Sequence, residues 1–138
     1  MAKFGPFKNG LIKVNAVNLS DHCTEFSVEK RAAELPDHTH GDETAIVTLG
    51  LFDWTIQGTF LQDFAAAKVN ATLRPLLDNR TRHGVECQGD AGSVSAANPK
   101  WSGTAVLVSY RPLGGPHGDN LQALATFRPA GDLNYSES

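Results

Sequence analysis

A change of hydrophobic period within residues 50–77 constrains the fold of this chain more than any other sequence feature. From residue 54 to residue 60, every second residue is large and apolar or is glycine: Trp54, Ile56, Gly58 and Phe60. This alternation is typical of a half-buried strand. After Asp63 the apolar residues fall at near-helical spacing and alanine is frequent, which favours a helix. We therefore expect a long strand and then the one substantial helix, with Asp63 as a plausible N-cap, a helical run from about Val69, and a last turn disturbed by Pro75.

Most of the remaining chain shows the alternation of strands. The further segments that we expect to be strands are Leu11–Val14, 24–31, 44–49, 81–88, 101–110 and 120–127. In the segment 101–110, strict alternation places Val108 and Tyr110 on one face. Many short strands separated by turn residues are typical of sandwiches and barrels. The sequence thus predicts a mainly β (α+β) fold, an antiparallel β-sandwich or barrel with one flanking α-helix and a long loop between early strands.

The chain of 138 residues predicts a single domain, since this length buries enough surface for a core of its own. Residues 1–10 are expected to form an extended N-terminal arm, and residues 134–138 a short frayed tail. Residues 32–43 are polar and contain Pro36 and Gly41. They predict a long loop near the upper limit for compact domains, where loops tend to be functional.

Composition excludes several classes of function. The net charge is −3 and no run of Lys or Arg is present, which argues against tight sequence-specific binding of nucleic acid. No apolar run reaches the length of a membrane span, and the N-terminus lacks the apolar region of a secretory signal. The two cysteines, Cys23 and Cys87, are interpreted as separate thiols, with a single Cys23–Cys87 bridge as the alternative.

The densest collection of metal-ligand residue types is the run Asp37, His38, His40, Asp42 and Glu43. Alternate spacing would bring both imidazoles to one side of an extended segment, where they could bind a divalent metal. The preferred interpretation is a solvated polar loop or a loop that packs on a partner chain. No motif of a nucleophilic enzyme is present, so we expect neither catalysis nor a cofactor.

Ten short segments in a fixed order carry a resemblance to a known family. They span the chain from about Leu11 to Leu133 and are 17–22, 41–44, 50–56, 60–66, 71–73, 75–77, 94–99, 101–105, 112–115 and 131–133. Among them are Gly-Leu-Phe-Asp-Trp-Thr-Ile at 50–56 and Trp-Ser-Gly-Thr-Ala at 101–105. Together they resemble the major tail (tail tube) proteins of bacteriophages with long, non-contractile tails.

The resemblance implies a structural virion protein without enzymatic activity, located in the tail after assembly in the host cytoplasm. In that family six copies form a ring, their sheets join into an inner barrel, and stacked rings make a tube. DNA passes through the tube without specific binding, and the partners are further copies and other phage tail proteins, with no membrane involved. The family's long loop reaches a neighbouring subunit or ring. The matching loop here suggests inter-subunit contacts at Leu35, Asp37, His38, His40 and Asp42.

The polar face of the strand at 54–61 is expected to line the channel, with Thr55, Gln57 and Thr59 as the candidate positions. Two other functions stay open at this point. One is a capsid decoration or head–tail connecting protein, which would also be β-rich and chemically inert. The other is a metal-dependent binding module or small enzyme centred on His38 and His40.

Overall fold

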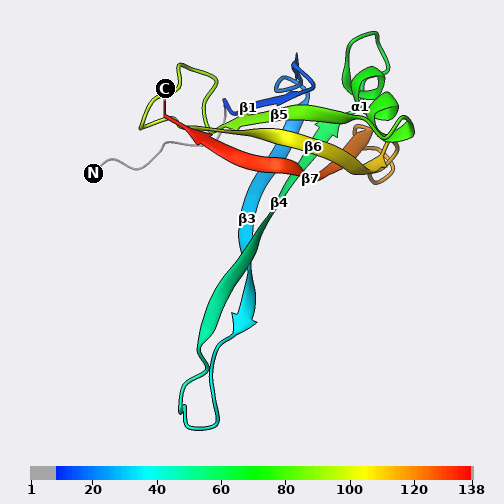
Figure 1. The fold of residues 1–138 in the computed structure, drawn as a ribbon. Coiled ribbons are helices and arrows are strands. Elements are labelled where there is room, and N and C mark those ends of the chain that lie inside the picture. Colours follow the sequence, from blue (N-terminus) through cyan, green and yellow to red (C-terminus); the bar gives the residue numbers. More distant parts are fainter. Residues whose placement is uncertain (1–8, 138) are drawn as a thin grey trace.

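The computed structural model describes residues 9–137, which form one antiparallel sheet and, within that range, one α-helix. In chain order the elements are β1 (Leu11–Val14), β2 (Val17–Asn18), β3 (Cys23–Pro36), β4 (Val47–Leu61), α1 (Val69–Asp78), β5 (Arg82–Gln88), β6 (Lys100–Arg111) and β7 (Gln122–Ser136). The order across the sheet is β2-β1-β5-β6-β7-β4-β3 (Figure 1). The predicted mainly β, antiparallel fold with one α-helix is confirmed.

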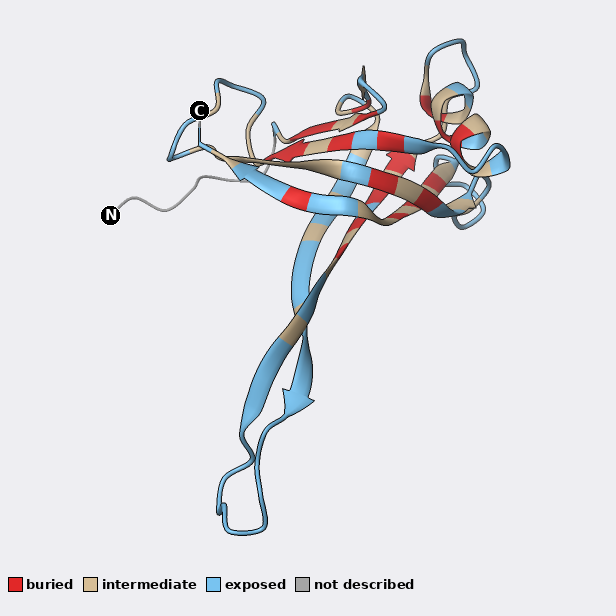
Figure 2. Ribbon diagram, in the orientation of Figure 1, coloured by how far each residue is buried: buried red, intermediate tan, exposed pale blue. Residues whose placement is uncertain are grey.

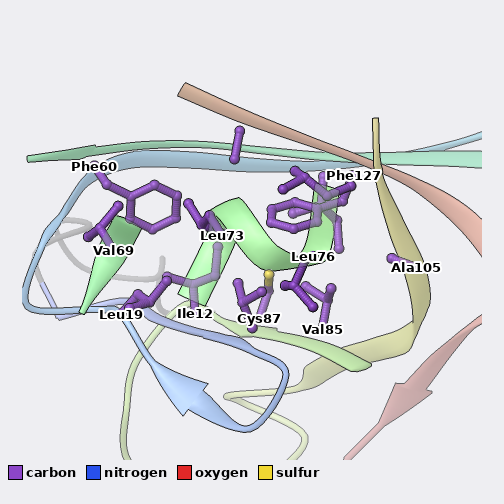
Figure 3. Packing of buried hydrophobic residues seen from close by; sticks show 14 of the residues in the cluster. Ile12, Leu19, Phe60, Val69, Leu73, Leu76, Val85, Cys87, Ala105 and Phe127 are labelled. Atoms are coloured by element: carbon purple, nitrogen blue, oxygen red, sulfur yellow. The ribbon is translucent and has the colours of Figure 1, made fainter. Parts of the chain in front are cut away.

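The sheet curves so that strands far apart in its order face each other across one core. A Cβ added to Gly58 of β4 would lie 3.6 Å from Cδ1 of Ile12 in β1. Near the same end, the backbone N–H of Leu61 donates to the carbonyl of His22 at 2.7 Å. Side chains from β1, β4, β5, β7 and α1 converge in the interior (Figure 3). This curvature gives the sandwich-like or barrel-like form that the sequence predicts.

Alternation along β4 follows the predicted pattern. Trp54, Ile56, Gly58 and Phe60 are buried on the inner face. Glycine is required at position 58 because a Cβ there would lie only 2.9 Å from the Phe60 ring. The Trp54 indole donates to the carbonyl of Gly131 at 3.0 Å, which fixes β4 against the last strand.

The helix begins at Val69 and contains Pro75, as predicted. Its buried side chains, Val69, Leu73 and Leu76, complete the core beside Phe60 and Phe127 (Figure 3). The N-cap is Lys68, without a side-chain hydrogen bond. The prediction of Asp63 as the N-cap is therefore wrong, because its carboxylate instead accepts from the N–H of Ala65 in the turn before the helix.

Two further local predictions are wrong, and β-bulges account for both. A register shift between Leu107 and Ser109 turns Tyr110 inward, where its hydroxyl donates to Asn70 of α1 at 3.0 Å. Val108 stays on the outside, half exposed. A second shift, between Gly103 and Ala105, absorbs residues 130–132, and β7 continues to Ser136. Residues 134–136 are thus paired with β6, not a frayed tail.

The predicted loop over residues 32–43 begins too early. Residues 32–36 belong to β3 and pair with β4, and the connection covers residues 37–46. Pro36 is accommodated because it ends a strand at the sheet edge. Of the expected N-terminal arm, residues 1–8 lie outside the described residues. No helix within residues 9–137 has the length and apolar character to cross a membrane.

Candidate assembly surfaces

The outer part of the β3–β4 hairpin projects from the body of the protein (Figure 1). We call residues 30–53, which comprise the ends of both strands and their connection, the arm. No residue of the arm is buried, and exposed positions cover nearly its whole length (Figure 2). The arm therefore contributes nothing to the core of its own chain.

Apolar side chains are concentrated on this exposed arm. Of the eleven large apolar side chains that are exposed among the described residues, six belong to the arm: Leu35, Ile46, Val47, Leu49, Leu51 and Phe52. Leu51 is 88% exposed and Phe52 is 69% exposed. Contiguous exposed apolar surface marks a protein interaction site. The arm is accordingly the first candidate surface.

Both faces of the arm carry apolar residues. Phe52 pairs with Ala32 and Leu49 pairs with Glu34, so all four project from one face. Leu35 pairs with Thr48 on the opposite face. An arm that is apolar on both faces is covered only when it lies between two surfaces.

The five predicted contact residues all lie on the arm, and all are exposed. Three of them shape its tip: the Asp37 carboxylate accepts from Thr48 at 2.9 Å, the Asp42 carboxylate accepts from the N–H of Thr39 at 2.8 Å, and Nδ1 of His38 lies 3.4 Å from the carbonyl of Ile46. Leu35 lies beside Gly50, where an added Cβ would be 3.4 Å from its Cδ1, and His40 is exposed. Within residues 9–137, no three His, Cys, Asp or Glu side chains are grouped to hold a metal ion. Their role as inter-subunit contacts stays a prediction.

The second candidate surface is the outer face of the sheet, opposite the core. Thr55, Gln57 and Thr59 lie together on this face, where they pair with Glu29, Ser27 and Glu25 of β3. On the β7 side, the guanidinium of Arg128 donates to Thr55 and to Asp53. The face is polar throughout this region, and Arg128 is neutralised by its carboxylate partner. Whether these positions line a channel stays a prediction.

The imidazole of His22, in the body of the protein, makes two contacts that connect its turn to neighbouring carboxylates. Both ring nitrogens of His22 lie 2.8 Å from carboxylates, those of Asp21 and Asp63. These two hydrogen bonds raise the pKa of His22 above its ordinary value. With both nitrogens occupied, the imidazole has no free nitrogen for general base catalysis or for a metal.

The two cysteines are free thiols, and their predicted separation is confirmed. Burial raises the pKa of Cys23 to about 11 and that of Cys87 to about 12. Reactive cysteines have lowered pKa values instead. Both thiols therefore stay protonated at neutral pH and act as small core residues.

Three apolar residues of the arm are candidate contact residues that the sequence interpretation missed. Leu49 belongs to the predicted strand 44–49, and Leu51 and Phe52 lie just before the predicted strand that starts at Trp54. The available signal was the loss of alternation, because three large apolar residues occupy four consecutive positions. The same pattern is also typical of a strand buried on both faces, so the sequence alone did not distinguish an exposed arm from a core strand.

Comparison with solved structures identifies the fold. A chain of the virion of a native gene transfer agent particle aligns with a TM-score of 0.72 and 16% identity, covering 98% of this chain and 99% of that one. The tail of an empty gene transfer agent particle, with C6 symmetry, gives 0.71 at 12% identity over 98% and 99%. The SPP1 tail tube gives 0.71 at 9% identity over 94% and 76%.

Neither a family model nor a curated protein matches the sequence. The structural likeness nevertheless extends over nearly the whole chain, in agreement with the resemblance seen in the order of its sequence segments. The chain has the fold of the subunits that build phage-type tail tubes.

Proposed function

We propose that this protein is the structural subunit of a tail tube, in which copies assemble into rings and the rings stack. The observation that carries the proposal is the arm, since its six large apolar side chains are between 45% and 88% exposed. The shared fold supports the same assembly. The C6 symmetry of one such tail favours rings of six copies.

The edges of the sheet suit ring closure. The sheet ends on one side at β3, a strand of 14 residues that pairs only with β4 among the described strands. On the other side it ends at β2, which has only two residues. Beyond β2, the carbonyl of Ile12 in β1 accepts from the N–H of Leu19, and the N–H of Ile12 donates to the Ser20 hydroxyl, so β3 is the longer edge that a second copy could extend. Because unpaired edges promote strand addition between chains, and closure into a barrel removes edges, neighbouring copies would join their sheets around the ring.

In this arrangement the outer face of the sheet lines the channel at Thr55, Gln57 and Thr59. Glu25 and Glu29 flank these residues on β3, and their charges repel the phosphates of DNA. The cation beside these three residues, Arg128, is paired with Asp53, so this part of the face would let DNA pass without being held. The proposed function is structural and requires no cofactor. The protein would be assembled in the host cytoplasm and located in the virion tail, with other tail proteins as partners.

Electron microscopy of the concentrated protein tests this function. Negative staining should show rings or tubes with a central channel, and light scattering should show growth of mass with concentration. The double variant Leu51→Asp with Phe52→Asp should stay monomeric with an unchanged Tm, because both side chains lie outside the core. The matched control Leu113→Asp alters an apolar residue that is 64% exposed but lies outside the arm, and it should assemble. A wild-type protein that stays monomeric at every concentration, even with other tail proteins present, would contradict the proposal.

A further inference from the structure

A groove at the C-terminal end of α1 combines an apolar wall with basic side chains. Its volume is about 650 Å³ and its lining residues are Leu77, Asp78, Arg80, Val106, Leu107 and Val108. We call it the helix-end groove. Arg82 adjoins it, because this residue pairs with Val106 and shares its face. Asp78 is engaged by Arg74 at 3.3 Å, whereas neither Arg80 nor Arg82 has a carboxylate partner among residues 9–137.

The backbone at Arg80 gives an independent reason to assign a role to its side chain. Arg80 follows the C-cap of α1, and its φ is 53°, in the left-handed region. Glycine is the residue that normally occupies this position after a helix, because other side chains are strained there. An arginine at this position therefore lowers the stability of the folded monomer through backbone strain. A contact of the guanidinium outside the monomer would account for its presence.

The tip of the arm, residues 34–47, carries acidic and apolar side chains that complement the basic and apolar side chains of the helix-end groove. Between residues 32 and 67 the sequence contains no Lys or Arg, whereas the tip carries Glu34, Asp37, Asp42 and Glu43. Asp37 and Asp42 hold the tip's own hydrogen bonds. Glu34 and Glu43 are exposed and have no ion-pair partner in the part of the chain that the structure describes. The neighbouring side chains Leu35, Ile46 and Val47 supply apolar surface for the groove wall.

The arm of a chain cannot reach its own helix-end groove. The arm projects away from the sheet on one side, and α1 lies on the opposite side (Figure 1). Two different surfaces that face away from each other form a head-to-tail contact, which propagates from copy to copy instead of closing as a dimer. This is the geometry that a stack of subunits requires.

We propose that the arm tip of one copy docks in the helix-end groove of a second copy, with Glu34 and Glu43 against Arg80 and Arg82. The inference rests on the proposed function and assigns the surface that receives the arm. Two other hollows fit an acidic tip less well. One carries Asp21 and Glu25 with no Lys or Arg, and the other combines Lys13 with Glu86 and Asp132.

A charge exchange between the two surfaces tests the contact. Arg80→Glu with Arg82→Glu should abolish tubes seen by negative staining, and so should Glu34→Lys with Glu43→Lys. The quadruple variant, which carries both changes in one chain, is the decisive protein. It should regain tubes because each docking contact then has opposite charges again. Circular dichroism and Tm verify that each variant is folded.

The matched control is Lys13→Glu with Lys68→Glu, which alters the net charge by the same amount as the groove variant but lies outside the groove. It should form tubes. Three results would overturn the docking contact: normal assembly of the groove variant, failure of the quadruple variant to regain tubes, or equal loss of tubes in the control. If the wild-type protein still forms tubes, the proposed function stands. A wild-type protein that never assembles would overturn both.

Discussion

Nε2 of His22 lies 2.8 Å from the Asp63 carboxylate and so ties the turn before β3 to the turn before α1. The same imidazole is hydrogen-bonded to Asp21 through Nδ1. The backbone carbonyl of His22 accepts from the N–H of Leu61 at the end of β4. Two segments that lie 41 residues apart in the sequence are thus joined at one residue. The pair of hydrogen bonds to Asp21 and Asp63 depends on protonation of His22, because an imidazole donates from both nitrogens only as the cation.

This cluster predicts a pH-dependent share of stability. The pKa of His22 is raised above 6.5 by Asp21 and then Asp63, so its contribution is complete below pH 6.5 and is lost as pH rises through the raised pKa. The carboxyl pKa values of both aspartates are lowered below 3.8, chiefly by His22 for Asp21 and by the Ala65 N–H for Asp63. Their contribution is lost as pH falls below 3.8.

The variant His22→Asn should therefore lower Tm most between pH 3.8 and pH 6.5. The difference from wild type should shrink on either side of that window. Thermal melts at half-unit steps of pH measure it. A Tm difference that is the same at pH 5 and at pH 9 would show that His22 acts only through packing.

Arg80→Gly separates folding from assembly. Because φ at residue 80 is 53°, glycine relieves a strain of roughly 1–2 kcal/mol, partly offset by the greater freedom of glycine in the unfolded chain. We expect the free energy of unfolding of the monomer to stay level or rise by about 1 kcal/mol. Tube formation should weaken, since one guanidinium is lost from the helix-end groove. Urea titration of a monomeric sample and turbidity of a concentrated one provide the two measurements.

Two glycine substitutions in adjacent strands should differ in sign. A Cβ at Gly103 of β6 would lie 2.8 Å from the carbonyl oxygen of Asp132 and 3.1 Å from the Trp54 ring. Gly103→Ala should therefore cost about 1–3 kcal/mol, the usual penalty of overpacking. At Gly84 of β5, nothing lies within 4 Å of an added Cβ, so Gly84→Ala should be neutral or slightly stabilising. Equal urea midpoints for the two variants would contradict the close approach at Gly103.

Truncation of two phenylalanines of the sheet should affect different properties, the stability of the monomer for Phe127 and assembly for Phe52. Phe127→Ala removes a fully buried ring and should cost about 3–5 kcal/mol. Phe52→Ala removes a ring that is 69% exposed and is covered on one side by the Lys30 ammonium, 4.5 Å from its centroid. It should cost the monomer less than about 1 kcal/mol but should reduce assembly. Denaturation and sedimentation of both variants test this contrast.

Regular alternation and helical spacing were sufficient to predict much of the fold. The buried positions Trp54 to Phe60 and the start of α1 at Val69 follow from local periodicity, because side-chain direction is set by backbone geometry within one element. β-bulges were not predictable in this way. The inward turn of Tyr110 depends on one extra residue in β6, which the residue types around it do not indicate.

The candidate surfaces were predictable in part, for a related reason. The family resemblance placed five candidate contact residues on the long loop, and the structure places all five on the exposed arm: Leu35, Asp37, His38, His40 and Asp42. Their contact role stays a prediction. Leu49, Leu51 and Phe52 were not recognised as candidate contact residues, because an apolar run has the same appearance in a core strand and on an exposed arm. Burial depends on what the rest of the chain packs against, and that is a property of the three-dimensional arrangement. Likewise, the strain at Arg80 is visible only in its backbone angle.

The exposed arm has a consequence for the protein before any assembly begins. A free subunit displays two apolar faces and a long edge strand to water, which are features that promote nonspecific association of β proteins. This association increases with concentration. In the proposed assembly, amorphous precipitation would compete with addition to the end of a tube, and the rate of synthesis relative to the number of growing ends would decide how much subunit is incorporated.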